Sequence, residues 1–216
     1  GADQQLPAPL KELAAFEKQQ LATAEHSFDD LAKLAGCELQ GFADIGNKVN
    51  GPEGLARIQA SQPDLIISVR FGLIIRDKVI AIPQHGVINL HSGVLPSYRG
   101  VMATFRAMLN KESGIGSTLH FIQDSGVDTG DIISIARITL ATDRSYLFNV
   151  LSLYEAGCEQ IIQAVAAVQA GQYLNGTPQQ GTAAYYSFPS DDELATFVAL
   201  DYRLFDPQDN TGHKQY

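Results

Sequence analysis

The 216-residue chain has 45% hydrophobic and 18% charged residues, a composition typical of one compact globular domain and not of a disordered or fibrous protein. Its 15 Lys and Arg residues against 24 Asp and Glu residues give a net charge of -9, which repels the phosphate backbone of nucleic acids. The sequence contains no apolar run of about eighteen residues and no signal-peptide pattern. We therefore expect a cytoplasmic protein with neither nucleic acid nor a membrane as a partner.

The two cysteines, Cys37 and Cys158, are far apart and lack the CxxC or Cys/His spacing of a metal site. Both lie in apolar, helix-like surroundings, where buried free thiols are common. We expect neither a disulfide bond nor a bound metal.

The first sixty residues predict three helices. Apolar residues at helical spacing indicate an amphipathic helix from Leu10 to Ala24. A second helix from Ser27 to Leu34 begins with a capping arrangement and ends before Gly36. A third helix follows a Gly and Asn turn and extends from Pro52 to Ala60.

From Leu65 onward, short β-branched runs alternate with helical segments. Such runs suit strands covered on both faces, and their alternation with helices favours an open α/β sheet with ligand sites at the carboxyl ends of its strands. The predicted strands are Leu65 to Val69, Val87 to Leu90, Thr118 to Ile122 and Ile132 to Ile138, and the predicted helices are Val101 to Leu109 and Arg144 to Ala170. The fold class is therefore α/β, with an open, mostly parallel, Rossmann-like sheet and helices on both faces.

The helical pattern stops at Gly171, and the sequence becomes irregular after Tyr173. A polar stretch that includes Pro178 and Gln179 leads into an acidic tail. We predict a catalytic α/β domain over residues 1–175 and a C-terminal extension over 176–216 that packs on it.

The segment from Gly86 to Gly100 concentrates unusual polar residues where a predicted strand ends. Asn89 and His91 are two residues apart, so a continuous strand directs both side chains to the same face. This places a neutral hydrogen-bond donor beside a titratable imidazole. A single Asn and a single His at a strand end are also common as turn formers or as satisfied polar groups.

A second polar cluster lies between the last two predicted strands. The loop from Gln123 to Asp131 contains two glycines that permit tight turns and three carboxylates within nine residues. Taken alone, such a loop is usually a solvated hairpin connection.

Together these segments resemble the folate-dependent formyltransferases, whose motifs are an Asn-x-His pair, an LP-x-x-x-G loop and an Asp within a GxDxG-like loop. The matching residues are Asn89 and His91, then Leu95, Pro96 and Gly100, then Gly126, Asp128 and Gly130. The resemblance is strong from Pro63 to Ile138 and weaker as far as the Pro178 and Gln179 stretch.

The resemblance implies that Asn89, His91 and Asp128 are the catalytic residues. An amine that attacks the formyl carbon generates a negatively charged oxygen, which an Asn amide and an imidazole can stabilise. The attacking nitrogen must lose a proton and the folate nitrogen must gain one, which suits an imidazole positioned by a carboxylate. This chemistry requires no metal.

The resemblance also implies N10-formyltetrahydrofolate as the formyl donor, with Phe71, Leu73, Ile75 and Asp124 in its binding site. Core packing is an equally good interpretation of Leu73 and Ile75, because apolar residues need no functional role to be buried. We interpret His120, on the facing strand, as a core histidine with satisfied hydrogen bonds, and a role in supporting the catalytic residues stays open as the alternative.

We assign the loop residues Ser92, Tyr98 and Arg99 to the substrate, and bracing of the loop is the alternative interpretation of Tyr98 and Arg99. Arg99 suits an amine that carries a phosphate or carboxylate group. Relatives of this type usually open with a strand, a small-residue loop and a helix, and we expect the usual first strand to be absent, because Gly1 and Ala2 lead directly into a helix-like segment. Truncation and genuine divergence both remain open as explanations.

We expect the acceptor to be a primary amine of a small molecule, with a nucleotide-linked amino sugar as the favoured class. Members of the family that formylate initiator tRNA carry a further β-rich domain, whereas about forty residues follow Asn175, and the charge of -9 disfavours tRNA. Two alternatives stay open: hydrolysis of the formyl-folate by water, and a non-catalytic relative that lacks its first strand. Dimers are common among such enzymes, so a homodimer also stays open.

Overall fold

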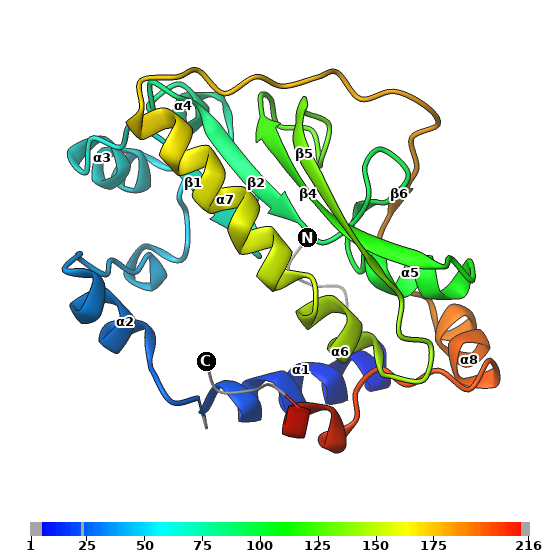
Figure 1. The fold of residues 1–216 in the computed structure, drawn as a ribbon. Helices are drawn as coiled ribbons and strands as arrows, with labels where there is room; N and C mark the ends of the chain where they lie inside the picture. Colours follow the sequence, from blue (N-terminus) through cyan, green and yellow to red (C-terminus); the bar gives the residue numbers. More distant parts are fainter. Residues whose placement is uncertain (1–5, 23, 213–216) are drawn as a thin grey trace.

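The computed structural model describes residues 6–22 and 24–212 and contains a four-stranded open sheet with the strand order β1-β2-β4-β5 (Figure 1). These strands are β1 (Ile66–Val69), β2 (Val87–His91), β4 (Gly114–Ile122) and β5 (Ile132–Thr139). A separate two-stranded sheet pairs β3 (Arg99–Gly100) in parallel with β6 (Tyr185–Tyr186). The expectation about Gly1 and Ala2 falls outside the described residues.

Eight α-helices and two 3-10 turns complete the described part of the chain. The α-helices are α1 (Ala8–Ala22), α2 (Phe28–Ala35), α3 (Pro52–Ala60), α4 (Asp77–Ile80), α5 (Ala103–Leu109), α6 (Tyr146–Leu151), α7 (Tyr154–Gln169) and α8 (Asp191–Ala199). The 3-10 turns are η1 (Ala43–Ile45) and η2 (Pro207–Gly212).

The predicted helices before the sheet are confirmed to within about two residues. The Ser27 side chain accepts a hydrogen bond from the backbone N–H of Asp30, and the Asp30 carboxylate accepts one from Ser27 N–H, which forms the expected capping box. Gly36 ends α2 in the left-handed conformation with φ 64°.

One predicted helix is in fact two. The segment from Arg144 to Ala170 is interrupted at Ser152 and Leu153, where α6 ends and α7 begins in a new direction (Figure 1). The reason is tertiary: α6 packs in an apolar cluster below the sheet, whereas α7 lies across the sheet itself. Helical periodicity persists through this break, so the sequence pattern did not reveal it.

The open α/β sheet is confirmed, but its strand directions need a correction. Among the described strands, β1 and β2 pair in parallel, whereas β2–β4 and β4–β5 are antiparallel, so the sheet is mixed. A loop of nine residues, 123–131, connects β4 to β5, and a connection this short cannot return the chain for parallel pairing.

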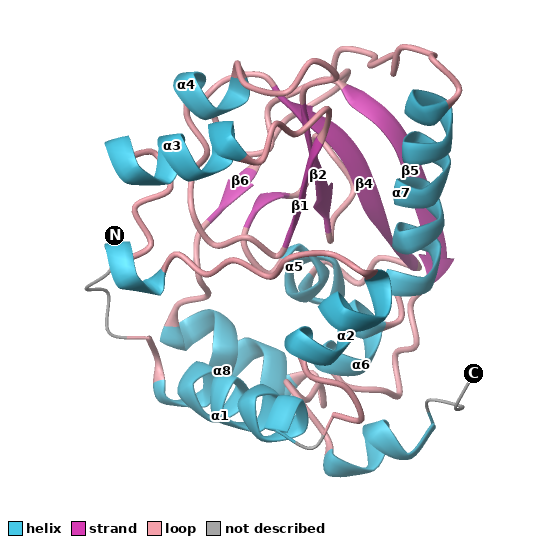
Figure 2. Ribbon diagram, turned by 90° about the vertical axis from the view of Figure 1, so that its left-hand side faces the viewer, coloured by secondary structure: helices cyan, strands magenta, loops and turns pink. Residues whose placement is uncertain are grey.

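Helices cover both faces of the sheet, as expected. On β2, Ile88 and Leu90 pack with Leu119 and with Ala164 of α7. Figure 2 shows α7 beside the sheet. The opposite face carries Val87, which packs with residues near α3 and α4. Side chains alternate along a strand, so every second residue of β2 after Val87 also lies on this second face.

The largest apolar cluster lies below the sheet and joins distant parts of the chain. It combines residues from α1, α5, α6 and α8, and the rings of Phe105 and Phe197 stack there with centroids 4.4 Å apart. Both rings are fully buried. Residues before and after position 175 therefore share one core, while the division into a domain and an extension stays a prediction.

Strand β1 is more exposed than its apolar sequence predicts. It is an edge strand of the described sheet, and the side chains of Ile67 and Val69 are 37% and 42% exposed.

Cys37 and Cys158 are both exposed, whereas the sequence suggested buried thiols, because each lies on a surface that no described element covers. Within the described ranges, no helix has the length and apolarity needed to cross a membrane.

Replacement of Phe197 by alanine tests whether α8 belongs to the core. We expect Phe197→Ala to lower the free energy of unfolding by about 3–5 kcal/mol, because a fully buried ring leaves a cavity. Val198→Ala, at a neighbouring side chain that is 67% exposed, should change it by less than about 0.5 kcal/mol. Urea denaturation measures both, and equal effects would show that α8 does not contribute to the core.

Candidate active site

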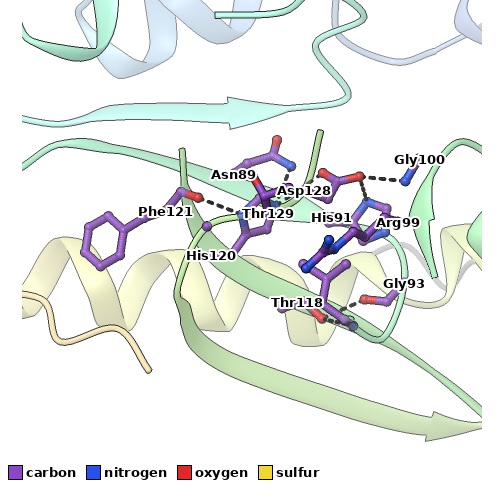
Figure 3. A network of polar contacts seen from close by, with 12 residues as sticks. Asn89, His91, Gly93, Arg99, Gly100, Thr118, His120, Phe121, Asp128 and Thr129 are labelled. Carbon is purple, nitrogen blue, oxygen red and sulfur yellow. Dashed lines mark hydrogen bonds and ion pairs between the residues drawn. The ribbon is translucent and has the colours of Figure 1, made fainter. Parts of the chain in front are cut away.

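Asn89 and His91 lie at the carboxyl end of β2 and point to the face opposite α7, as their spacing predicts (Figure 3). The next residue in the chain, Ser92, begins the loop that leads to Gly100 and is half-buried. The strand end therefore brings the amide and the imidazole to one point.

Strand β4 supplies two further side chains to this face. Antiparallel pairing sets His120 directly opposite Asn89 and Thr118 directly opposite His91. The Asn89 amide donates to His120 Nε2 over 3.2 Å, and His120 Nδ1 donates to the carbonyl of Phe121 over 2.8 Å. His120 is thus satisfied, as expected for a core histidine, but it also belongs to the polar cluster.

Asp128 completes the cluster from the loop between β4 and β5. Its carboxylate lies 3.5 Å from His91 Nδ1 and 3.4 Å from His120 Nε2, and its Oδ2 accepts a 2.8 Å hydrogen bond from the backbone N–H of Gly100. Its backbone is in the left-handed region with φ 53°, which is uncommon for a residue with a side chain. The Asp128 end of the loop is therefore a structured part of the site, while residues 123–127 are exposed.

The contacts of His91 define where it can take up a proton. Its Nε2 lies 2.6 Å from the carbonyl oxygen of Tyr98, which can only accept, so Nε2 carries the hydrogen. In the neutral ring, Nδ1 is then the basic nitrogen, and it faces Asp128. Burial lowers the pKa of His91, while the charge of Asp128 opposes this shift.

The carboxylate of Asp128 is favoured in its charged form. Burial acts to raise the pKa of Asp128, but the contacts with His120 and His91 and the N–H of Gly100 together lower it below its ordinary value. The site therefore combines a neutral imidazole with an anion beside its basic nitrogen. A proton that arrives on His91 Nδ1 is stabilised at once by Asp128.

A buried hydroxyl holds the loop after β2. Thr118 Oγ1 donates to the carbonyl of Gly93 over 2.6 Å and accepts from the N–H of Leu95 over 3.2 Å. The ring of Tyr98 points into the core, where its hydroxyl donates to Glu112, and burial raises the pKa of Tyr98 to about 12. The structure therefore does not bring the Tyr98 ring to the cluster of Asn89, His91 and Asp128; its carbonyl reaches His91.

Arg99 lies beside the cluster, and its partner was not among the predicted site residues. Gln179 accepts hydrogen bonds from Arg99 Nε and Nη2 at 3.2 and 2.7 Å, and it donates to the carbonyls of Asp128 and Gly130, both at 2.8 Å. The sequence placed Gln179 in an irregular stretch, and no local pattern indicates that this stretch reaches the site.

A cavity of about 110 Å³ opens beside Asn89 and Asp128. All four residues predicted to bind the folate line it, together with Asn89, His120 and Asp128; the four are Phe71, Leu73, Ile75 and Asp124. The walls are mainly apolar, while amide, imidazole and carboxylate groups gather at one end. Among the described residues, no group of three His, Cys, Asp or Glu side chains is arranged to hold a metal ion.

The structure combines an open α/β sheet with an Asn, a His and an Asp side chain that converge at a strand end, which is the arrangement that the resemblance to formyltransferases predicts. The Formyl transferase family model matches residues 19–147, and methionyl-tRNA formyltransferase from Syntrophomonas wolfei is 32% identical over 158 residues, or 72% of this chain and 50% of that protein. The chain belongs to the formyl transferase family. It spans about half the length of the curated relatives it matches.

Solved structures agree with this assignment. The formyltransferase PseJ from Anoxybacillus kamchatkensis, in complex with UDP-4,6-dideoxy-4-formamido-L-AltNAc and tetrahydrofolate, has 26% identity and a TM-score of 0.55 over 68% of this chain and 75% of that one. A sugar N-formyltransferase from Shewanella shares the fold at 14% identity, with a TM-score of 0.59 over 90% of this chain and 84% of that one. The Rossmann-like fold is thereby confirmed.

The Asp128→Asn substitution tests the electrostatic link to His91. We expect the pKa of His91 to fall further, because the negative charge that opposes the effect of burial is lost while the side-chain volume is kept. NMR titration of the imidazole proton resonances measures this shift. Asp131→Asn, on the same loop but with its carboxylate bonded to Gln123, is the matched control. An unchanged His91 titration in Asp128→Asn would disprove the link.

Proposed function

We propose that this protein transfers a formyl group from N10-formyltetrahydrofolate to a primary amine of a small molecule. The observation that carries the proposal is the convergence of Asn89, His91 and Asp128 beside a cavity in a formyl transferase fold. Each of the three comes from a motif that the family resemblance assigns to catalysis. The site residues and their roles below are part of this proposal.

The lining of the cavity suits the pterin ring of a reduced folate. Phe71 and Leu73 line it and are each 43% exposed, so a flat ring that enters the cavity covers apolar surface otherwise left in water. Asp124 and Asn89 add hydrogen-bonding groups at its polar end, where a pterin carries donors and acceptors. When bound there, N10-formyltetrahydrofolate supplies the formyl group.

The chain contributes a donor and a proton acceptor. Asn89 has two amide hydrogens, and one is directed to His120, so the other is available to an oxygen that gains negative charge during transfer. His91 Nδ1 takes the proton that the attacking amine loses, and Asp128 stabilises the resulting imidazolium. The same imidazolium returns the proton to the leaving nitrogen.

The acceptor class rests on charge and on the relatives. PseJ is bound to a nucleotide-linked sugar, whereas the matched curated relatives are methionyl-tRNA formyltransferases. The net charge of -9 favours a small acceptor over a nucleic acid. Arg99 supports an acceptor with an anionic group, since its Nη1 makes no hydrogen bond within the described residues. The homodimer and the cytoplasmic location stay predictions.

The test is a donor-turnover assay with N10-formyltetrahydrofolate, nucleotide-linked amino sugars and methionyl-tRNA as separate acceptors. We expect tetrahydrofolate release to depend on an amino sugar and to fall by about 10²- to 10⁴-fold in His91→Ala and in Asn89→Ala, because each removes a group that acts in the transition state. His26→Ala, at an exposed histidine remote from the cavity, should retain full activity.

The other outcomes separate the alternatives. Turnover that needs no amine identifies a hydrolase, and turnover with methionyl-tRNA alone overturns the small-molecule acceptor. A folded protein that turns over with none of them contradicts formyl transfer and identifies a non-catalytic relative.

A further inference from the structure

The oxygen and the nitrogen of the Gln179 amide both form hydrogen bonds to residues of the candidate active site. Its Oε1 accepts from two nitrogens of Arg99, and its Nε2 donates to the carbonyls of Asp128 and Gly130. A carboxamide has two donor hydrogens and one acceptor oxygen, so no hydrogen-bonding capacity is left for another role. The orientation of the amide is also determined, because only its nitrogen can donate to the two carbonyls.

The backbone on each side of Gln179 is anchored as well. Thr177 exchanges two backbone hydrogen bonds with Ile132 at the start of β5, at 2.8 and 2.9 Å. Ala184 donates to the carbonyl of Pro96 and accepts from the N–H of Arg99 at the start of β3. Gln179 therefore lies in a segment attached to both loops that build the site, and its side chain is pre-organised.

The Asp128 loop needs such an anchor. Asp128 adopts a left-handed conformation that costs a residue with a side chain on the order of 1 kcal/mol, and it persists only where the surroundings hold it. On the sheet side the loop is pressed against β4: a Cβ on Gly130 would lie 1.9 Å from the carbonyl oxygen of Phe121. Gln179 holds the other side through the carbonyls of Asp128 and Gly130.

We propose that Gln179 is a positioning residue for formyl transfer, which holds the Asp128 loop so that the carboxylate stays against His91 and which orients Arg99 from the same amide. It touches neither His91 nor the folate cavity, so it acts through Asp128 and Arg99. This inference rests on the proposed formyl transfer, and its test includes a measurement that needs no turnover.

Two variants separate the two ends of the amide. Gln179→Met keeps the length and volume and removes all four hydrogen bonds, whereas Gln179→Glu still accepts from Arg99 but turns an oxygen toward the carbonyls of Asp128 and Gly130. The adjacent Gln180 is exposed, and its amide contacts only the carbonyl of Pro178 at 3.5 Å. Gln180→Met and Gln180→Glu are therefore matched controls for volume and charge.

We expect both Gln179 variants to lower kcat by about 10- to 100-fold, since a displacement of about 1 Å in a catalytic group has effects of this size. The KM for N10-formyltetrahydrofolate should change by less than about twofold, because the walls of the cavity are untouched. Gln179→Glu should lose at least as much activity as Gln179→Met. The Gln180 variants should match the unaltered protein in both constants.

The second measurement is hydrogen exchange of the Gly100 amide, which donates to Asp128 Oδ2. If the carboxylate moves, this amide should exchange at least about tenfold faster in the Gln179 variants and at an unchanged rate in the Gln180 variants. Should the unaltered protein turn over no acceptor, the proposed function fails, while Gly100 exchange still tests whether Gln179 positions Asp128.

Two results overturn the inference. One is a kcat within about twofold of the unaltered protein in both Gln179 variants, even with a lower melting temperature, because Gln179 would then be a structural bridge alone. The other is unchanged Gly100 exchange, with or without a loss of kcat, because Asp128 would have stayed in place.

Discussion

The site depends on one carboxylate held away from water between two imidazoles. Asp128 lies within 3.5 Å of His91 and His120 and takes a hydrogen bond from the N–H of Gly100. The N–H of Gly100 offsets part of the hydration that this charge loses, and an imidazole does so as well once it is protonated. Because the partners come from β2, β4 and the loop before β3, the carboxylate is stable only when all of these elements are in place.

The segment after α7 anchors the parts of the chain that hold Asp128 and His91 together. It crosses from the end of α7 to β6 (Figure 1) and makes backbone contacts with the start of β5 and with the segment from Pro96 to β3. The loops themselves are pressed closely against their neighbours: a Cβ on Gly100 would lie 2.1 Å from the carbonyl oxygen of Tyr186. Residues 177–186 therefore shape a site whose predicted catalytic residues all come from the middle of the chain.

Sequence reasoning succeeded where the information is local. Strand alternation brought Asn89 and His91 to one face, and the family resemblance added Asp128 and the apolar walls of the cavity. It placed His120 on a facing strand but not in register, and the antiparallel pairing that sets His120 opposite Asn89 came only from the structure, because strand partners are chosen by packing over long separations. It also missed Gln179, whose partners are 49 to 80 residues away.

The sequence by itself determined the helices before the sheet, the carboxyl ends of the strands and the residue types that the chemistry requires, because periodicity, capping and turn preferences act over a few neighbouring residues. Helices α4 and α8 were not predicted. Only the tertiary structure decided that the sheet is mixed and that α6 and α7 are separate. It also decided that Tyr98 faces the core while Arg99 reaches Gln179. These outcomes depend on which distant surfaces bury one another and on which buried polar groups find partners, and neither is encoded within a local window.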